Sequence, residues 1–425
     1  NEDVIGEGTF TGTTRFVNLI NVPNANQVTG SAQAFVNRYD IVDHHANDAT
    51  GFSATLMLDT QTQQYTLSFR STEFRDENLG GDYDRDAVKA DGDIAVHGFA
   101  FAQLLAMEEY VARLKQGVTS DGTFDAGLQA FFGNPTHQLN VTGYSLGGHL
   151  ATVFTELHES EVLHTYLFNA SGRGSLPGAV PGLAAEEQRI ADMLAYFRRV
   201  LDNPDEALPS ITRGQHYQDA VTAWTNDPTW DPFDQGTATL YDDPRYQWAR
   251  AATLDAFDPI GTSTIEIATG FQGEPQTTGA FAKMTALYGQ AVSGDLEVVA
   301  NSGVHRAGQS VFIEGQPLLE NALGILPFGG QVDFGNTHAI TLLVDSLSLQ
   351  ELFLTLDPQL QQAQIEALIR SSSNAESDLV ALTTASHAAE GDSLEKALEG
   401  LRTLFLPSPV TPPTLNFDDA PGGFG

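Results

Sequence analysis

The pentapeptide at residues 143–147 contains the residue types needed for nucleophilic catalysis, with Ser145 at its centre between two glycines. It follows a short apolar run at residues 138–142 and leads into a helical pattern at residues 149–154. A strand, a tight Gly-x-Ser-x-Gly turn and a helix make up a nucleophile elbow. Glycines let the strand and the helix approach closely, and N–H groups at the helix start can stabilise an oxyanion. The pattern can arise by chance among 40 glycines, but its flanking elements favour a serine hydrolase.

A serine nucleophile needs a general base, and His338 has the best context among the 11 histidines. It follows a strand-like run and precedes an apolar helical pattern at residues 341–356. This position, downstream of the serine, matches hydrolases with the chain order Ser…Asp…His. A capping or core histidine is the alternative. His149, within the helix after Ser145, is expected to be a packing residue.

Two strand-like runs, residues 54–59 and 64–69, flank a polar turn and predict a hairpin. The second run continues into Arg70, Ser71 and Thr72. The Thr72 hydroxyl and a backbone N–H group could lie beside the nucleophile. Spacing alone favours the alternative, in which Thr72 is an ordinary strand-end residue.

An acidic stretch at residues 76–93 is expected to be a loop. Its carboxylates follow the spacing of a calcium-binding loop, although Ala87 replaces the usual glycine. A solvated acidic surface is the alternative. The candidate calcium ligands are Asp82, Asp84, Asp86 and Asp93.

The order of elements predicts an α/β fold. Apolar spacing indicates a helix over residues 96–114, and a strand at residues 164–170 follows the elbow helix. We divide the chain into a first core part (residues 1–174), an insertion (175–292), a second core part (293–406) and a Pro- and Gly-rich tail (407–425).

The insertion is predicted to be mostly helical and to act as a cap or lid. A structural subdomain without a gating role is the alternative. The expected helices of the insertion span residues 184–201, 243–257 and 281–288. The sheet is then expected to resume with strands at residues 296–301 and 310–314, and further helices lie within residues 359–405.

Composition excludes several classes of partner. The chain of 425 residues has 20 Lys and Arg against 55 Asp and Glu, a net charge of −35. Such a surface repels nucleic acids and anionic membranes, and its self-repulsion predicts a saline habitat. Absence of cysteine excludes disulfides and thiolate chemistry. No transmembrane segment or signal peptide is expected, and because the first residue is Asn1, we expect a mature or excised product.

Five motifs, taken in order, resemble the class 3 lipase family, and more closely its large bacterial extracellular lipases and phospholipases with a long insertion. The resemblance covers residues 55–175 and 295–356. The motifs lie at residues 67–72, 96–99, 143–151, 168–172 and 337–340.

The resemblance implies an α/β-hydrolase-like fold: a mostly parallel sheet flanked by helices, with a helical lid insertion and extra C-terminal helices. Ser145 matches the nucleophile and His338 the base. Thr72 and the backbone N–H of Leu146 match the oxyanion donors. The implied activity is hydrolysis of carboxylic esters of lipids at an interface, by a secreted bacterial enzyme that requires no cofactor. Oligomeric state is left open.

The acid of the triad departs from the family pattern. The family places an Asp after the strand that follows residues 168–174, but the expected strand ends in Asn301. We rank Asn301 first on topology and Asp258 second, with Glu314 and Asp295 as weaker alternatives. Asp→Asn in a serine triad costs roughly 10⁴ in turnover.

Two other functions remain open. One is a soluble short-chain esterase or thioesterase, in which the insertion is a fixed wall. The other is a non-catalytic lipid- or glycan-binding module that has lost its acid.

Overall fold

The computed structural model describes residues 35–73, 81–168, 170–176, 183–203, 241, 243–259, 261, 279–287, 340–361 and 364–365, to which the structural statements refer.

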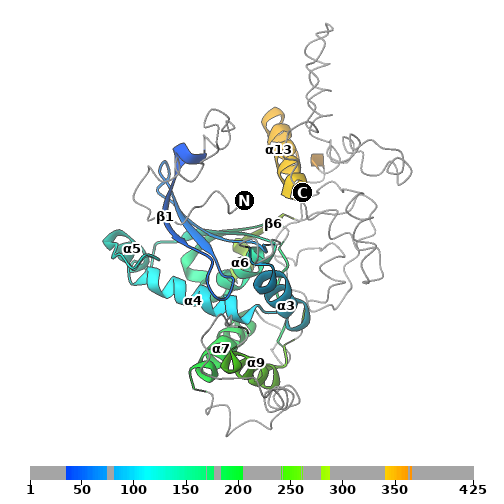
Figure 1. Cartoon of the computed structure of the whole chain (residues 1–425). Helices are drawn as coiled ribbons and strands as arrows, with labels where there is room; N and C mark the ends of the chain where they lie inside the picture. Colours follow the sequence, from blue (N-terminus) through cyan, green and yellow to red (C-terminus); the bar gives the residue numbers. More distant parts are fainter. Residues whose placement is uncertain are drawn as a thin grey trace, which may run out of the picture.

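A six-stranded mixed sheet forms the centre of the described fold (Figure 1). Its strands lie side by side in chain order: the first three are antiparallel, and the third to the sixth are parallel. Phe69, Gly143 and Leu167 are paired across β3, β4 and β5, so the carboxyl ends of these strands meet at one edge. The strands are β1 (Tyr39–His45), β2 (Ala54–Asp59), β3 (Tyr65–Phe69), β4 (Leu139–Tyr144), β5 (Val162–Phe168) and β6 (Met284–Leu287).

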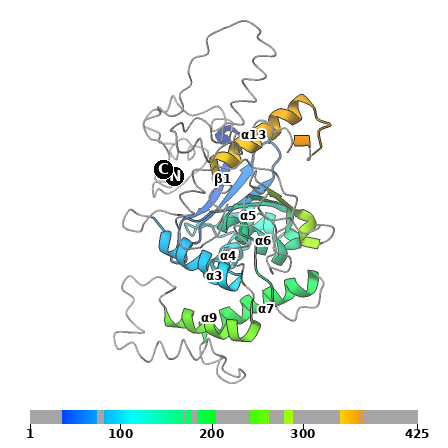
Figure 2. The ribbon, with the colours of Figure 1, turned by 90° about the vertical axis from the view of Figure 1, so that its right-hand side faces the viewer.

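Helices cover one face of the sheet in two layers (Figures 1 and 2). The inner layer contains α4 and α6, and α7 and α9 form the layer beyond it, while α13 lies on the opposite side of the sheet. The helices are η4 (Asp84–Ala90, a π-helix), α3 (Asp91–His97), α4 (Phe101–Lys115), α5 (Ala126–Phe132), α6 (Leu146–Leu157), η5 (Glu159–Glu161), α7 (Leu183–Asp202), α9 (Pro244–Phe257), η8 (Gly279–Lys283) and α13 (Ile340–Leu356).

Alternation along the strands explains why these helices pack where they do. In β4, Leu139, Val141 and Gly143 are buried while their neighbours are partly exposed. Side chains of a strand alternate between the two faces, so one face of β4 joins the core beneath α4 and α6. None of the described helices is long and apolar enough to cross a membrane.

Most elements expected from sequence are confirmed. The hairpin is β2–β3, the elbow strand and helix are β4 and α6, and β5 pairs parallel with β4. The expected helices near residues 184–201, 243–257 and 341–356 are α7, α9 and α13. The coarse prediction of an α/β fold with a mostly parallel sheet is therefore confirmed.

The acidic stretch at residues 76–93 is not a loop in its described part. It forms η4 and α3, and α3 ends at Gly98, whose positive φ of 82° only glycine adopts readily. The following helix starts at Phe101 rather than at residue 96. Ion pairs between Asp side chains of this segment and arginines elsewhere in the chain stabilise η4 and α3. The spacing of residues in the sequence does not reveal these ion pairs.

The expected helix at residues 281–288 is also wrong. Its place is taken by η8 and by β6, which pairs parallel with β5. The sheet therefore resumes before the expected boundary at residue 293. Short apolar runs fit strand and helix alike, which explains the error. The strands expected at residues 296–301 and 310–314 lie outside the described residues.

The described helices of the insertion belong to the main core. Phe197 of α7 stacks on Phe101 at a centroid distance of 5.6 Å and meets Tyr246 of α9 edge-on at 5.6 Å. All three side chains are buried. This packing favours a structural subdomain over a moving lid for α7 and α9.

Candidate active site

Ser145 occupies a strained turn between β4 and α6. Its φ of 53° and ψ of −117° lie in a region that non-glycine residues rarely adopt. Phe168, at the end of β5, and Ser171, in the loop after it, hold the turn in place: Ser145 N donates to Phe168 O at 3.0 Å, and Ser145 O accepts from Ser171 N at 3.2 Å. This is the strand-turn-helix geometry expected of a nucleophile elbow.

The glycines around Ser145 are required by close backbone contacts. A Cβ on Gly143 would lie 2.0 Å from Gly147 O, and one on Gly147 would lie 2.4 Å from Phe69 O. A Cβ on Gly148 would lie 2.5 Å from the Cβ of Ala170. The three glycines thus allow β3, β4 and the first turn of α6 to meet around one serine.

Leu146 is the first residue of α6, so its N–H group has no acceptor within the helix ladder. Its side chain is buried with Ala90, Ile94 and Ala100. This small cluster ties the elbow to η4 and α3. The N–H group and the positive end of the helix dipole can stabilise negative charge beside Ser145.

Thr72 follows β3, the strand that runs parallel beside the elbow strand. Its hydroxyl donates to Asp91 Oδ2 at 2.8 Å. Burial raises the pKa of the Asp91 carboxyl to about 7, and the hydrogen bond from Thr72 lowers it only in part. Sequence alone does not reveal Asp91 as a site residue, because it lies 19 residues from Thr72 and meets it only when α3 packs beside the end of β3.

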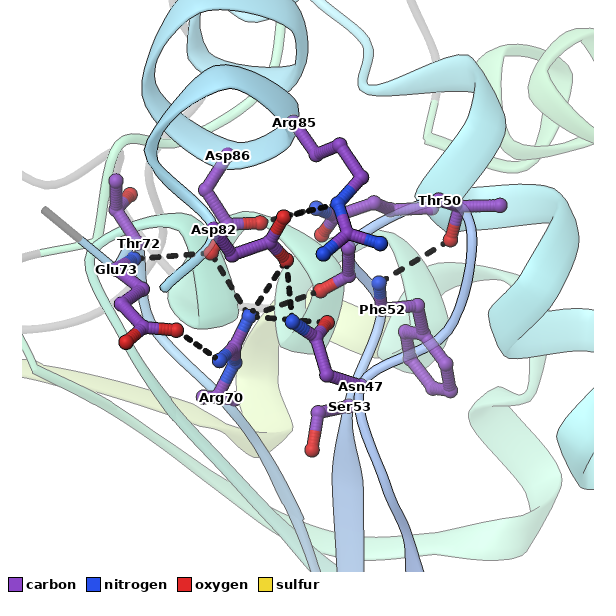
Figure 3. Close-up of polar contacts among 12 residues, drawn as sticks. Asn47, Thr50, Phe52, Ser53, Arg70, Thr72, Glu73, Asp82, Arg85 and Asp86 are labelled. Atoms are coloured by element: carbon purple, nitrogen blue, oxygen red, sulfur yellow. Dashed lines mark hydrogen bonds and ion pairs between the residues drawn. The ribbon is translucent and has the colours of Figure 1, made fainter. Parts of the chain in front are cut away.

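Arg70, two residues before Thr72, is the centre of a buried polar network (Figure 3). Its Nη2 binds Asp82 Oδ2 at 3.1 Å and Asp86 Oδ2 at 2.9 Å, and Nη1 binds Glu73 Oε2 at 3.0 Å. Burial raises the pKa of Asp86 to about 7; Arg70 lowers it and the nearby Asp82 raises it. Arg85 also binds Asp82.

Three of the four candidate calcium ligands therefore have cationic partners. Asp82 and Asp86 bind Arg70, while Asp93 binds Arg250 of α9 at 2.8 Å. Asp84 lies in the first turn of η4. In the described part of the chain, no three His, Asp or Glu side chains are grouped to hold a metal ion. These contacts favour a role in ion pairing, and calcium binding stays a prediction.

His149 has the packing role expected of it. The ring is fully buried; Nδ1 donates to Gly172 O at 2.6 Å, and Nε2 accepts from Ala100 N at 3.2 Å. Burial lowers its pKa to about 4, so the ring is neutral at ordinary pH. It joins the loop before α4 to the loop after β5.

A second buried contact fixes the loop after β5. Arg173 binds Glu156 of α6 through Nε at 2.6 Å and through Nη2 at 2.7 Å, and neither side chain is exposed. Because Ser171 in the same loop binds Ser145 O, this pair supports the turn at Ser145.

The other triad candidates are not brought together here. His338 and Asn301 lie outside the described residues. Asp258 is exposed and ends α9 in a left-handed conformation with φ of 48°. Its backbone N–H donates to Leu254 O at 2.9 Å.

Comparison with models of known protein families finds no match, and comparison with curated proteins finds none either. Function is therefore inferred from the residues themselves.

Proposed function

We propose that the protein is a serine hydrolase that cleaves carboxylic esters of lipids, as a lipase or phospholipase A does. The observation that carries this proposal is the backbone of Ser145, with φ of 53° and ψ of −117° at a glycine-lined strand-to-helix turn. Maintaining such strain needs the surrounding contacts described above, and strain of this kind is concentrated at functional sites.

In the proposed reaction, Ser145 Oγ attacks the ester carbonyl carbon while His338 takes the hydroxyl proton. The Leu146 N–H and the Thr72 hydroxyl stabilise the oxyanion. The intermediate collapses, and the alcohol leaves with the proton from His338. Water then hydrolyses the acyl-enzyme by the same steps.

The position of β6 changes the choice of triad acid. The family resemblance places the acid after the strand that follows residues 168–174, and β6 is the described strand beside β5. Asp295 follows β6 in the chain, so we now rank it beside Asn301 and Asp258 rather than as a weaker alternative. Of these three, Asp295 and Asp258 can stabilise an imidazolium by charge.

Covalent labelling tests the proposal. A fluorophosphonate should label the unmodified chain once, at Ser145, and Ser145→Ala should abolish both labelling and hydrolysis of nitrophenyl esters. Ser120→Ala is the matched control, because its hydroxyl binds Asp43 Oδ2 at 2.7 Å, and this contact is unrelated to the elbow. Ester hydrolysis that persists in Ser145→Ala would contradict the proposal, and absence of labelling would favour a non-catalytic binding module.

A soluble short-chain esterase or thioesterase is the second candidate function. It is favoured by the packing of α7 and α9 into the core, because a fixed helical wall does not open at an interface. A chain-length series of nitrophenyl esters, with and without lipid vesicles, distinguishes the two. A lipase prefers long acyl chains and gains activity at an interface, whereas a short-chain esterase does neither.

A further inference from the structure

The short segment that carries Thr72 is held at both ends. On one side, Arg70 Nη1 donates to Glu73 Oε2 at 3.0 Å. On the other, Asp86 Oδ2 accepts from Arg70 Nη2 at 2.9 Å and from the backbone N–H of Glu73 at 2.9 Å. One guanidinium and one carboxylate therefore bracket Thr72, as Figure 3 shows.

The guanidinium is itself fixed by buried partners. Asp82 and Asp86 have exposures of 0% and 1%. Arg70 Nη2 also donates to Gly51 O at 3.2 Å, and Gln103 donates to Asp86 Oδ1 at 2.8 Å. A buried charge that loses its partner is strongly destabilising, so Asp82 and Asp86 both require the guanidinium to stay within reach. These contacts therefore define one position for it.

The bracketed segment is also in direct contact with the elbow. A Cβ on Gly147 would lie 2.7 Å from Arg70 O, so the first turn of α6 touches the backbone of Arg70. Arg70 N donates to Ser53 O at 3.0 Å, which fixes the same residue to the strand on its other side. The position of residues 70–73 is thus set relative to the helix that begins at Leu146.

We propose that Arg70 is a positioning residue for hydrolysis: its guanidinium binds Glu73 on one side and the buried Asp82 and Asp86 on the other, and by fixing residues 71–73 in this way it places the Thr72 hydroxyl for the oxyanion. This inference rests on the proposed function. Lysine cannot replace Arg70, because an ammonium group lacks the planar fork that binds Glu73 and Asp86 at once.

A double-mutant cycle tests the proposal with a soluble nitrophenyl ester as substrate. Thr72→Val should lower kcat by about 100-fold to 1,000-fold, because it removes one oxyanion donor. Arg70→Lys should lower kcat by up to about 100-fold, because it misplaces that donor; KM should change little in both variants. The combined variant should be little worse than Thr72→Val alone. If Arg70 had only a structural role, Arg70→Lys would lower the melting temperature, but its effect on kcat would not depend on whether Thr72 is present.

Two further variants keep the test decisive. Glu73→Gln weakens the ion pair with Arg70, and it replaces Arg70→Lys in the cycle if that variant does not fold. In the Glu73→Gln variant, Thr72→Val should lower kcat by a smaller factor than in the unmodified chain. Arg38→Lys is the control, because the Arg38–Asp59 pair lies at the opposite end of β2 from Ala54, and Ala54 pairs with Phe69. It should leave kcat unchanged.

The proposal is overturned if Thr72→Val lowers kcat by the same factor in the Arg70→Lys and Glu73→Gln variants as it does in the unmodified chain, while hydrolysis still requires Ser145. Hydrolysis that does not require Ser145 would instead overturn the proposed function and this inference together.

Discussion

At the scale of residues, the hydroxyl of Thr72 has one proton to donate and two possible acceptors. It donates to Asp91 at 2.8 Å, and a hydroxyl that donates to a carboxylate cannot donate to an oxyanion at the same time. If Asp91 is protonated, its O–H can donate to Thr72, and the Thr72 proton then points elsewhere. The raised pKa of Asp91, about 7, makes both states accessible near neutrality.

Asp91→Asn should therefore change the pH dependence of catalysis. An amide N–H can donate to Thr72 at every pH, so the ratio of kcat for Asp91→Asn to that of the unmodified chain should rise from about pH 6 to about pH 9. Initial rates with a soluble ester measure this ratio. A ratio that stays constant with pH would show that the Asp91 proton does not affect the Thr72 hydroxyl.

The same substitution has a consequence for folding. In the unfolded chain Asp91 ionises near its ordinary pKa, which is lower than in the folded protein, so the folded state loses stability as pH rises toward about 7. Denaturant unfolding should show Asp91→Asn gaining stability relative to the unmodified chain above about pH 7, by more than about 0.5 kcal/mol. At about pH 5 the difference should shrink.

Glycine contacts at the elbow allow a second test at this scale. Gly143→Ala should destabilise the protein by several kcal/mol, because its Cβ would lie 2.0 Å from Gly147 O and backbone must move. Gly92→Ala in α3 is the control: apart from its chain neighbours and the backbone of its own helix, no atom lies within 4 Å of its added Cβ, and alanine favours a helix by about 1 kcal/mol. Equal unfolding midpoints for the two variants would contradict the described packing.

At the scale of elements, the buried pair Glu156–Arg173 joins α6 to the loop after β5. Glu156→Gln should destabilise the protein by about 3–5 kcal/mol, because it leaves the Arg173 charge buried without its counterion. Glu109→Gln breaks the exposed pair with Arg198 and should cost less than about 1 kcal/mol. Chemical denaturation compares them, and a similar loss in both would argue against a structural role for the buried pair.

Elements with a strong local signal could be predicted from sequence. The strand, turn and helix around Ser145 are predictable because the serine and its two glycines have a fixed spacing, and the hairpin is predictable because polar residues separate two β-like runs. The helix α3 was missed because its Asp-rich sequence has little apolar periodicity and is held by partners distant in the chain, such as Arg250 for Asp93. Partners of this kind leave no local pattern.

The candidate site shows the same division. Ser145 could be placed from its strand, turn and helix, whereas Leu146 and Thr72 were expected only through the family resemblance; the structure puts all three at the ends of adjacent elements. Asp91 and the Arg70 network could not, since both depend on side chains that meet only after η4 and α3 pack on the end of β3. Whether His338 serves as the base stays a prediction.

At the scale of the whole molecule, the net charge of −35 governs the response to salt. Repulsion among exposed carboxylates destabilises the folded state at low ionic strength, and salt screens it. The melting temperature should therefore rise between about 0.05 M and about 1 M sodium chloride. Potassium chloride should give a similar rise if screening is the cause. A melting temperature that is independent of both salts would contradict the expectation of a saline habitat.

The π-helix η4 determines the directions in which the Asp86 and Asp91 side chains point toward the end of β3. Asp86 and Asp91 are joined by a hydrogen bond from Asp91 N to Asp86 O, the i to i+5 spacing of a π-helix. In an α-helix, residues five apart point about 140° away from each other, whereas the wider π-helical turn brings them closer to the same side. The same sequence wound as an ordinary α-helix would therefore turn one carboxylate away from either Arg70 or Thr72. An inserted residue, which would leave the two carboxylates six apart and about 120° from each other in an α-helix, is expected to be far less tolerated than a substitution.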